Sequence, residues 1–159
     1  MNRAEHIAAL RAAGDSLATG DRLLLPGWSD ADWNKLLDCT RPRPFRTSDM
    51  LIQHGETERA LYFIVDGVLE VGITRVDGVS ISPLAKINAG SVIGEQSFFD
   101  GEPRSANVWA DSDGELLRLE FDDFTRFSRK HPALARDLLF ALARVLSSRL
   151  RNTTFRVRR

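Results

Sequence analysis

The chain has 159 residues, enough for one domain with a sizeable core, and its 22 basic residues are balanced by 22 acidic ones. This balance leaves no bulk basic field of the kind that binds nucleic acid, and the single cysteine, Cys39, excludes an internal disulfide or a cysteine-ligated iron–sulfur cluster. No stretch has the length of a membrane span, and residues 1–20 lack the apolar core of a signal peptide. We therefore expect a cytoplasmic protein whose partners include neither nucleic acid nor a membrane.

The N-terminal part of the chain predicts two helices. Apolar residues recur at helical spacing over residues 3–17, and this helix is expected to stop near Gly20. A second helix should begin after Ser29, a good N-cap, and should bury Trp33, Leu36 and Leu37. Trp28 stands where it would staple against that helix. Residues 41–44 read Arg-Pro-Arg-Pro, which cannot continue a helix and marks the entry to a different architecture.

Residues 45–124 show strand and turn signals throughout. Short apolar runs alternate with Asp-Gly pairs, which favour the positive-φ turns of hairpins and begin at Asp66, Asp77, Asp100 and Asp113. The strand-like runs 107–110 and 115–120 flank the last of these pairs and are predicted to form a hairpin. Short strands at this spacing indicate a sandwich or barrel rather than a parallel sheet.

The C-terminal part returns to helical patterns. Residues 121–127 predict one helix, and His131-Pro132 marks its end and the start of the next. That last helix carries two adjacent apolar stripes, formed by Leu134, Leu138, Leu142 and Val145 and by Leu139, Leu146 and Leu150. The apolar face is wider than one contact requires, so we expect it to touch both its own domain and a second copy. The chain ends in an arginine-rich segment without acids, for which we expect a solvated, disordered tail.

Residues 90–108 combine features that suit a sugar phosphate. Gly94 permits a close approach of backbone to a ligand, and a helical turn after it points free N–H groups outward. Arg104, ten residues later, can bind a phosphate through two N–H groups. Glu95 cannot bind that anion and needs another partner, such as a sugar hydroxyl.

These residues resemble the phosphate-binding cassette of the cyclic nucleotide-binding domain family. The sensor domain of the catabolite activator protein is of this family. Residue type and spacing agree at five positions, Gly94, Glu95, Pro103, Arg104 and Ala106, and the resemblance extends over roughly residues 28–152. It implies a mainly β fold with flanking helices: an eight-stranded antiparallel β-roll, similar to a jelly roll, with N-terminal helices, a short cassette helix and two C-terminal helices. Transcription factors of the family continue into a helix-turn-helix that these residues lack, so we expect a stand-alone sensor.

The expected organisation is one structural domain with three parts. An N-terminal helical segment covers residues 1–44, and the β-roll covers residues 45–124 with the cassette at 90–108. Residues 125–159 form the C-terminal helices, which serve as lid and dimer helix, and the basic tail.

The resemblance assigns the cassette residues to the nucleotide. Arg104 would pair with a cyclic-phosphate oxygen, and Glu95 would accept a hydrogen bond from the ribose 2′-hydroxyl. The alternatives are a surface arginine paired with an acid, and a carboxylate that complements a helix dipole. Gln96 and Ser97 would offer backbone N–H groups to the phosphate; Gln96 departs from the family's usual apolar residue. The motif's remaining positions near the ligand are Ser105 and Ala106.

Ser105 leaves the base preference open, because family members use a hydroxyl at this position either on the phosphate or on the amino group of guanine. The ligand is therefore expected to be cAMP or cGMP. The candidate base pocket and lid consist of Val71, Leu84, Arg149, Leu150 and Thr153. For each of these five, an ordinary place in the core or at a helix end is the alternative.

The sequence predicts a regulatory protein and no enzyme. Its three histidines, His6, His54 and His131, are too scattered for the metal cluster of a cupin, and no nucleophile–base arrangement can be read. We expect no metal, no cofactor and no catalytic residue, and a sensor that dimerises through its last helix and regulates a partner protein. A degenerate member that serves as a docking or dimerisation module without nucleotide is the main alternative; a cupin-like enzyme and a haem or redox sensor are the others.

Overall fold

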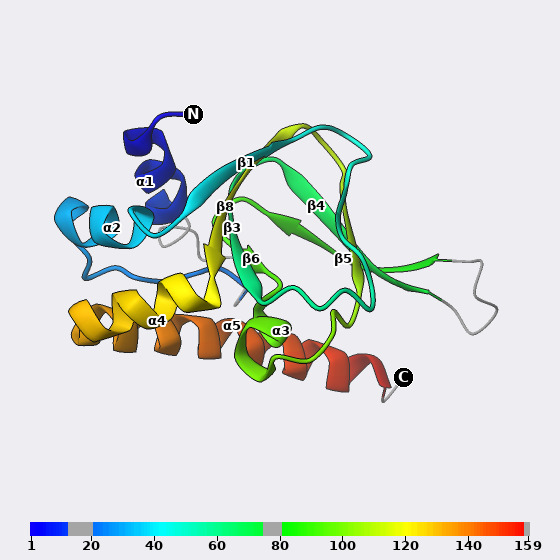
Figure 1. Ribbon diagram of the computed structural model, residues 1–159. Coiled ribbons are helices and arrows are strands. Elements are labelled where there is room, and N and C mark those ends of the chain that lie inside the picture. Colours follow the sequence, from blue (N-terminus) through cyan, green and yellow to red (C-terminus); the bar gives the residue numbers. More distant parts are fainter. Residues whose placement is uncertain (13–20, 75–80, 158–159) are drawn as a thin grey trace.

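A computed structural model describes residues 1–12, 21–74 and 81–157 of the chain (Figure 1). The predicted continuation of the first helix through Leu17 to Gly20, the Asp77-Gly78 turn, and Arg158 and Arg159 lie outside the described residues. The helices are α1 (Arg3–Ala12), α2 (Asp30–Leu37), α3 (Glu95–Asp100), α4 (Phe121–Lys130) and α5 (Pro132–Val157). The strands are β1 (Arg41–Phe45), β2 (Met50–Ile52), β3 (Ala60–Asp66), β4 (Val68–Thr74), β5 (Ile81–Asn88), β6 (Val92–Ile93), β7 (Asn107–Ala110) and β8 (Gly114–Glu120).

The eight strands form two antiparallel sheets, with the orders β1-β8-β3-β6 and β2-β7-β4-β5. The predicted eight-stranded antiparallel β-roll with flanking helices is therefore confirmed. Side chains of β3 alternate between two cores: Tyr62 and Ile64 lie between the sheets, whereas Leu61 and Phe63 face the helices. Because β3 is covered on both faces, its sequence is a continuous apolar run rather than an alternating one.

The prediction of a hairpin between residues 107–110 and 115–120 is wrong. β7 pairs with β2 and β4, and β8 pairs with β1 and β3, so the two strands belong to different sheets. The Asp-Gly pairs at 66 and 113 instead form two corners that pack on each other. A Cβ on Gly67 would lie 2.7 Å from the carbonyl oxygen of Asp113, and one on Gly114 would lie 2.3 Å from that of Asp66. Gly101 likewise ends α3 in the left-handed conformation rather than a hairpin.

The predicted boundaries of the β-roll shift at both ends. β1 begins at Arg41, inside the segment expected to be helical, because an edge strand tolerates prolines that cannot donate to a ladder. At the other end β8 stops at Glu120 rather than at residue 124, and α4 starts at Phe121, as predicted for the helix over residues 121–127. The β-roll thus begins at Arg41, before the expected residue 45, and its last strand ends at Glu120, before the expected residue 124.

The predicted start of α2 is confirmed in detail. Ser29 is the N-cap, and its hydroxyl oxygen accepts a hydrogen bond from the backbone N–H of Asp32, whose carboxylate accepts one from the N–H of Ser29. The rings of Trp28 and Trp33 meet edge to face with their centroids 5.1 Å apart, as a hydrophobic staple requires. This cap fixes the point at which the chain approaches the roll.

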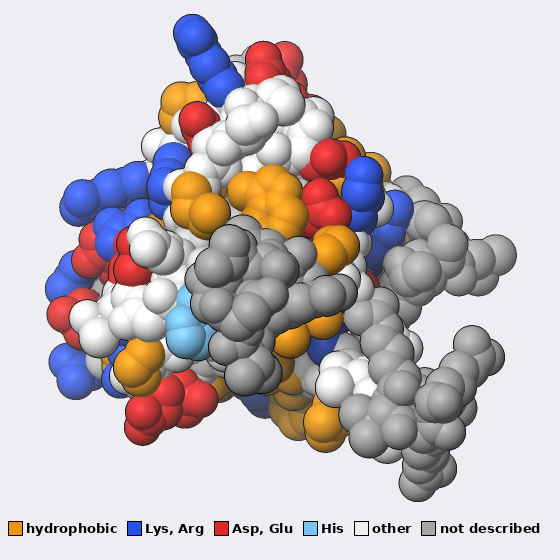
Figure 2. All heavy atoms as spheres, turned by 90° about the vertical axis from the view of Figure 1, so that its right-hand side faces the viewer, with side chains coloured by type: hydrophobic (Ala, Val, Ile, Leu, Met, Phe, Trp, Pro, Cys, Tyr) orange, Lys and Arg blue, Asp and Glu red, His pale blue; other side chains and the backbone are white. Residues whose placement is uncertain are grey.

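The C-terminal helices lie along one side of the roll, and α3 lies on the same side (Figure 1). Pro132 starts α5, and the side chains of Leu138, Leu142 and Val145 are fully buried against the roll. α5 runs to Val157, so the disordered tail expected at this end is wrong up to that residue. None of the described helices has the length and apolar character needed to cross a membrane. Basic and acidic side chains alternate on the face seen in Figure 2, without a field of one sign.

Candidate functional site

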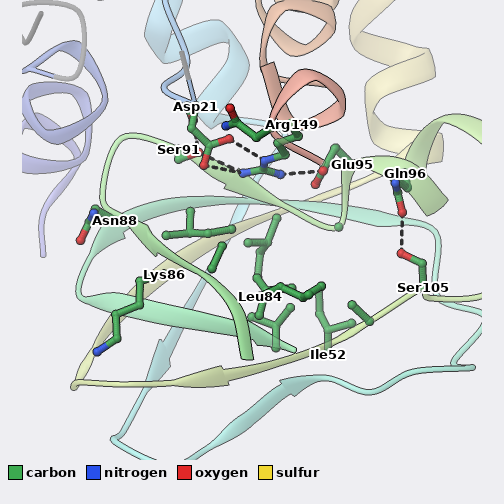
Figure 3. Close-up of a pocket in the computed structure, with 18 of the residues that line it drawn as sticks. Asp21, Ile52, Leu84, Lys86, Asn88, Ser91, Glu95, Gln96, Ser105 and Arg149 are labelled. Carbon is green, nitrogen blue, oxygen red and sulfur yellow. Dashed lines mark hydrogen bonds and ion pairs between the residues drawn. The ribbon is translucent and has the colours of Figure 1, made fainter. Parts of the chain in front are cut away.

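A cavity of about 670 Å³ opens between the roll, α3 and the C-terminal half of α5. Its floor is apolar and comes from strands of both sheets, and its walls carry the polar groups of the cassette and of α5 (Figure 3). All seven predicted cassette residues line it: Gly94, Glu95, Gln96, Ser97, Arg104, Ser105 and Ala106. The structure thus brings together residues that the sequence separates by a turn and a helix.

Gly94 stands at the N-terminus of α3 and packs against the guanidinium of Arg104. Its φ of 76° is left-handed, and a Cβ there would lie 2.6 Å from Nη1 of Arg104 and 2.9 Å from the carbonyl oxygen of Ala60. A side chain would therefore be strained by its backbone and would displace the arginine. Glycine at this position lets the start of α3 lie directly against the guanidinium of Arg104.

Arg104 is 2% exposed, and its guanidinium is held from the side away from the solvent. Nη1 donates to the carbonyl oxygen of Gly94 at 2.9 Å, and Nη2 donates to that of Ala60 at 2.9 Å and to Glu58 at 3.2 Å. Its Nε–H is buried and finds no hydrogen-bond partner among the described residues. A buried donor of this kind is costly unless an acceptor reaches it, so the wall of the cavity is suited to an anion.

Glu58 supports Arg104 from behind and does not line the cavity. Its carboxylate also accepts hydrogen bonds from Arg118, at 2.7 Å and 3.0 Å, and from the hydroxyl of Tyr62, at 2.9 Å and 3.0 Å. Burial raises the pKa of Glu58, but the bonds from Tyr62, Arg118 and Arg104 outweigh it and hold the pKa below its ordinary value. Burial and the neighbouring Glu58 raise the pKa of Tyr62. The group is thus a carboxylate shared by two arginines and a neutral phenol.

We expect Glu58→Gln to lower stability near neutral pH and to flatten its fall in acid. The folded-state pKa of Glu58 lies below its ordinary value of 4.5, so its contribution is present above that pH and is lost as the pH falls through the lower, folded value. Urea unfolding across this range should show the largest gap between wild type and variant above pH 4.5, closing below it. Glu102→Gln, on an exposed side chain, is the control and should follow the wild-type curve. A gap that does not change with pH would contradict this role.

Arg149 reaches from α5 into a cluster of acceptors (Figure 3). Its Nη1 lies 2.6 Å from Oε1 of Glu95, and its Nε donates to Asp21 at 2.6 Å. Burial lowers the pKa of Arg149, but Glu95 and Asp21 outweigh it and raise the pKa above its ordinary value. Glu95 itself is buried, 8% exposed, in the first turn of α3. The residue predicted as acceptor for a ribose hydroxyl is therefore also in contact with α5.

Gln96 and Ser105 meet at the opposite end of the cavity from Asp21 (Figure 3). The Ser105 hydroxyl donates to Oε1 of Gln96 at 2.5 Å, which joins α3 to the segment after Arg104. Ser97 is buried, and its carbonyl oxygen accepts the N–H of Gly101 at the end of α3. The roles of these residues toward a ligand stay predictions.

Four of the five candidates for the base pocket and lid line the cavity, and their contact with a base stays a prediction. Val71, Leu84, Arg149 and Thr153 line the cavity. Leu150 does not, and its side chain is 68% exposed, so its predicted place over the base is wrong. One residue along a helix turns a side chain by about 100°, and with Arg149 directed inward Leu150 must face outward.

Sequence reasoning missed several residues of the site. Asp21, Ser91 and Asn152 line the cavity, and Glu58 supports Arg104 without lining it. Asp21 precedes the roll and meets Arg149 from a position 128 residues away, and no local pattern marks such a pair. The polar Glu58 just before the apolar run of β3 was the one available signal. Among the described residues there is no cluster of His, Cys, Asp and Glu side chains able to hold a metal ion.

Comparison with known proteins agrees with this geometry. The profile of the family described as "Cyclic nucleotide-binding domain" matches residues 42–131. The chain is 33% identical over 123 residues to a cyclic AMP receptor protein of Thermus thermophilus, covering 77% of this chain and 56% of that protein. It is 31% identical over 127 residues to "Glutaminase 1" of Bradyrhizobium diazoefficiens, covering 80% of this chain and 20% of that protein.

A cyclic nucleotide-binding domain of Methylobacillus flagellatus, known from its crystal structure, has the same fold. It superposes with a TM-score of 0.80 at 24% identity, over 98% of this chain and 82% of that one. The chain spans about a fifth to about half the length of the curated relatives described above. The match of the family profile over more than half of the chain, on a β-roll with its cassette residues assembled, shows that this protein belongs to the cyclic nucleotide-binding domain family.

Proposed function

We propose that the chain is a cyclic nucleotide sensor that binds cAMP or cGMP in the cavity and has no catalytic role. The observation that carries the proposal is Arg104, which is 2% exposed in the cavity wall and whose Nε–H lacks a partner among the described residues. An oxygen of a cyclic phosphate supplies the missing acceptor, and its negative charge complements the guanidinium. Glu95 accepts the ribose 2′-hydroxyl, and Val71 and Leu84 contact the base.

The proposed output is a movement of α5. Arg149 joins this helix to Glu95, so a ligand that binds the ribose acceptor favours the arrangement in which α5 lies against the cavity. The nucleotide must bind this closed arrangement better than an open one, and the shift in population changes the surface offered to a partner protein. Similar segments occur in proteins named as a glutaminase and as a cyclic AMP receptor, which fits a sensor whose output is supplied elsewhere.

Thermal unfolding tests ligand binding in the presence of cAMP, cGMP or the linear nucleotide 5′-AMP. A ligand at a hundred times its Kd stabilises the folded state by about 2.7 kcal/mol, which raises the Tm by several degrees. We expect this rise with at least one cyclic nucleotide and a smaller one with 5′-AMP. The alternative, a docking module that works without nucleotide, is favoured by the Arg149–Glu95 pair, because that pair already satisfies Glu95 in part. It predicts no rise with any of the three.

The outward face of α5 supports a homodimer as part of the proposal. Leu139, Ala143, Leu146 and Leu150 follow one another at spacings of four, three and four residues, which is the seam of a two-helix contact. The side chains of Leu139 and Leu150 are 38% and 68% exposed, and that of Phe140 beside them is 69% exposed. Apolar side chains left outside the protein's own core fit a second copy of the same helix.

We expect Leu150→Asp to convert the dimer into a monomer, because two carboxylates would face each other across the seam without a partner. Sedimentation equilibrium at several protein concentrations measures the change. Arg129→Asp alters an exposed charge on α4, away from the seam, and should leave the dimer intact. A wild-type protein that stays monomeric at high concentration, or an L150D dimer as tight as the wild type, would contradict the proposed interface.

A further inference from the structure

The guanidinium of Arg149 is held on every side by residues of other elements. Its Nε and Nη2 face the two carboxylate oxygens of Asp21, at 2.6 Å and 3.4 Å. Nη2 also donates to the carbonyl oxygen of Val92 at 2.7 Å and to the hydroxyl of Ser91 at 3.3 Å. Nη1 alone is left for Glu95, which it meets at 2.6 Å (Figure 3). Asp21 therefore occupies the Nε–Nη2 edge of the guanidinium, and Nη2 is also committed to Val92, so neither edge is free for a two-point contact with a second carboxylate.

Asp21 and the residues after it are held by hydrogen bonds to the segment just before β6. Its carbonyl oxygen accepts a hydrogen bond from the hydroxyl of Ser91, and two residues later the N–H of Leu23 donates to the carbonyl oxygen of Gly90 at 3.0 Å. The side chain of Leu23 is fully buried in the core beneath the helices. The segment that carries Asp21 thus runs along the edge of the cavity, and both Asp21 and Arg22 line it.

As a result, the two carboxylate oxygens of Glu95 have different partners. Arg149 binds Oε1, and none of the described residues bonds Oε2. With Nε and Nη2 committed to Asp21 and Val92, Arg149 does not take both oxygens of Glu95 in a fork-to-fork pair. Oε2 is left as an acceptor on a buried carboxylate in the cavity wall.

We infer that Asp21 is a positioning residue for ribose recognition: by holding Arg149 in a one-point contact, it keeps Glu95 available to the 2′-hydroxyl of the nucleotide. The inference rests on the proposed function and adds to it a selectivity for ribose over 2′-deoxyribose that depends on the N-terminal segment. Asp21 and Arg149 both lie outside residues 42–131, which the family profile matches. In Asp21→Asn the guanidinium loses its carboxylate partner, so it turns to Glu95, takes both oxygens and displaces the hydroxyl.

The test compares the Kd of cAMP with that of 2′-deoxy-cAMP, and of cGMP with that of 2′-deoxy-cGMP, by titration calorimetry. A hydrogen bond to a carboxylate makes the ribose form bind roughly ten- to a hundredfold more tightly in the wild type. In D21N we expect this ratio to fall to about threefold or less, with the affinity for the 2′-deoxy nucleotide nearly unchanged. Asp30→Asn removes another aspartate paired with an arginine, Arg11, and should keep the wild-type ratio.

The outcomes separate this inference from the function on which it rests. A D21N protein with the wild-type ratio would overturn the inference and leave the proposed sensor intact. A D21N protein that loses both forms of the nucleotide equally would give Asp21 only a structural role and also overturn it. A wild-type protein that binds none of the four nucleotides would overturn the sensor and the inference together.

Discussion

Arg104→Ala lowers the affinity for the cyclic nucleotide by roughly one to two decades, the loss expected for a buried charge-assisted contact. The guanidinium brings a positive charge and a buried N–H, which has no partner in the described part of the chain, into the cavity wall, and alanine removes both. The variant also leaves Glu58 without one of its three hydrogen-bond donors. Titration calorimetry with cAMP and with cGMP measures the change.

Two further variants test whether the loss of affinity is specific to the guanidinium of Arg104. Arg104→Lys keeps the charge but not the planar fork, so it should recover only part of the lost affinity. Arg126→Ala removes an arginine whose side chain is 67% exposed on α4 and should bind as the wild type does. An R104A protein that is folded and binds within twofold of the wild type would show that the phosphate is held elsewhere.

Phe98→Ala destabilises the protein by about 3–5 kcal/mol, the range for a large aromatic side chain removed from a core. Phe98 is fully buried in α3, and its ring centroid lies 5.5 Å from those of Phe121 and Phe124 and 5.6 Å from that of Phe99. These edge-to-face contacts join the cassette helix to the start of α4. The loss is therefore a large share of the total stability of a domain of this size.

Urea unfolding measures this loss, with Phe99→Ala as the matched control. Phe99 is only half-buried and packs on Phe98 from the rim of the cluster, so its truncation should cost clearly less. Equal effects of the two substitutions would contradict the central place of Phe98. Because α3 carries Glu95 and Gln96, we also expect F98A to weaken nucleotide binding even where it remains folded.

The features that could be predicted from the sequence are those that depend on residues close together along the chain. The cap of α2 depends on Ser29 and Asp32, three residues apart, and its geometry follows from side-chain chemistry alone. The eight strands followed from apolar runs between turn residues and from the family resemblance. Their pairing did not, because Asp66-Gly67 and Asp113-Gly114 look like hairpin turns locally, whereas the choice of sheet depends on distant strands.

The same distinction applies to the site: residues close together in the sequence could be predicted, and distant partners could not. The cassette lies within a short stretch of chain, residues 90–108, so its motif and spacing are enough to identify Glu95 and Arg104 as candidates. Their partners are distant: Glu58 is 46 residues from Arg104, and Asp21 is 128 residues from Arg149. Leu150 was misplaced because two adjacent positions on a helix were both assigned to one cavity, and only the packing of α5 decides which of them faces it.

Titration calorimetry of the wild-type protein with cAMP and with cGMP tests the central claim most directly. The protein should first be freed of any bound nucleotide by unfolding and refolding, so that an occupied cavity does not mask the titration. We predict saturable binding of at least one of the two with a Kd in the micromolar range or below. Folded protein that shows no heat of binding, released or absorbed, with either nucleotide at several temperatures would contradict the account.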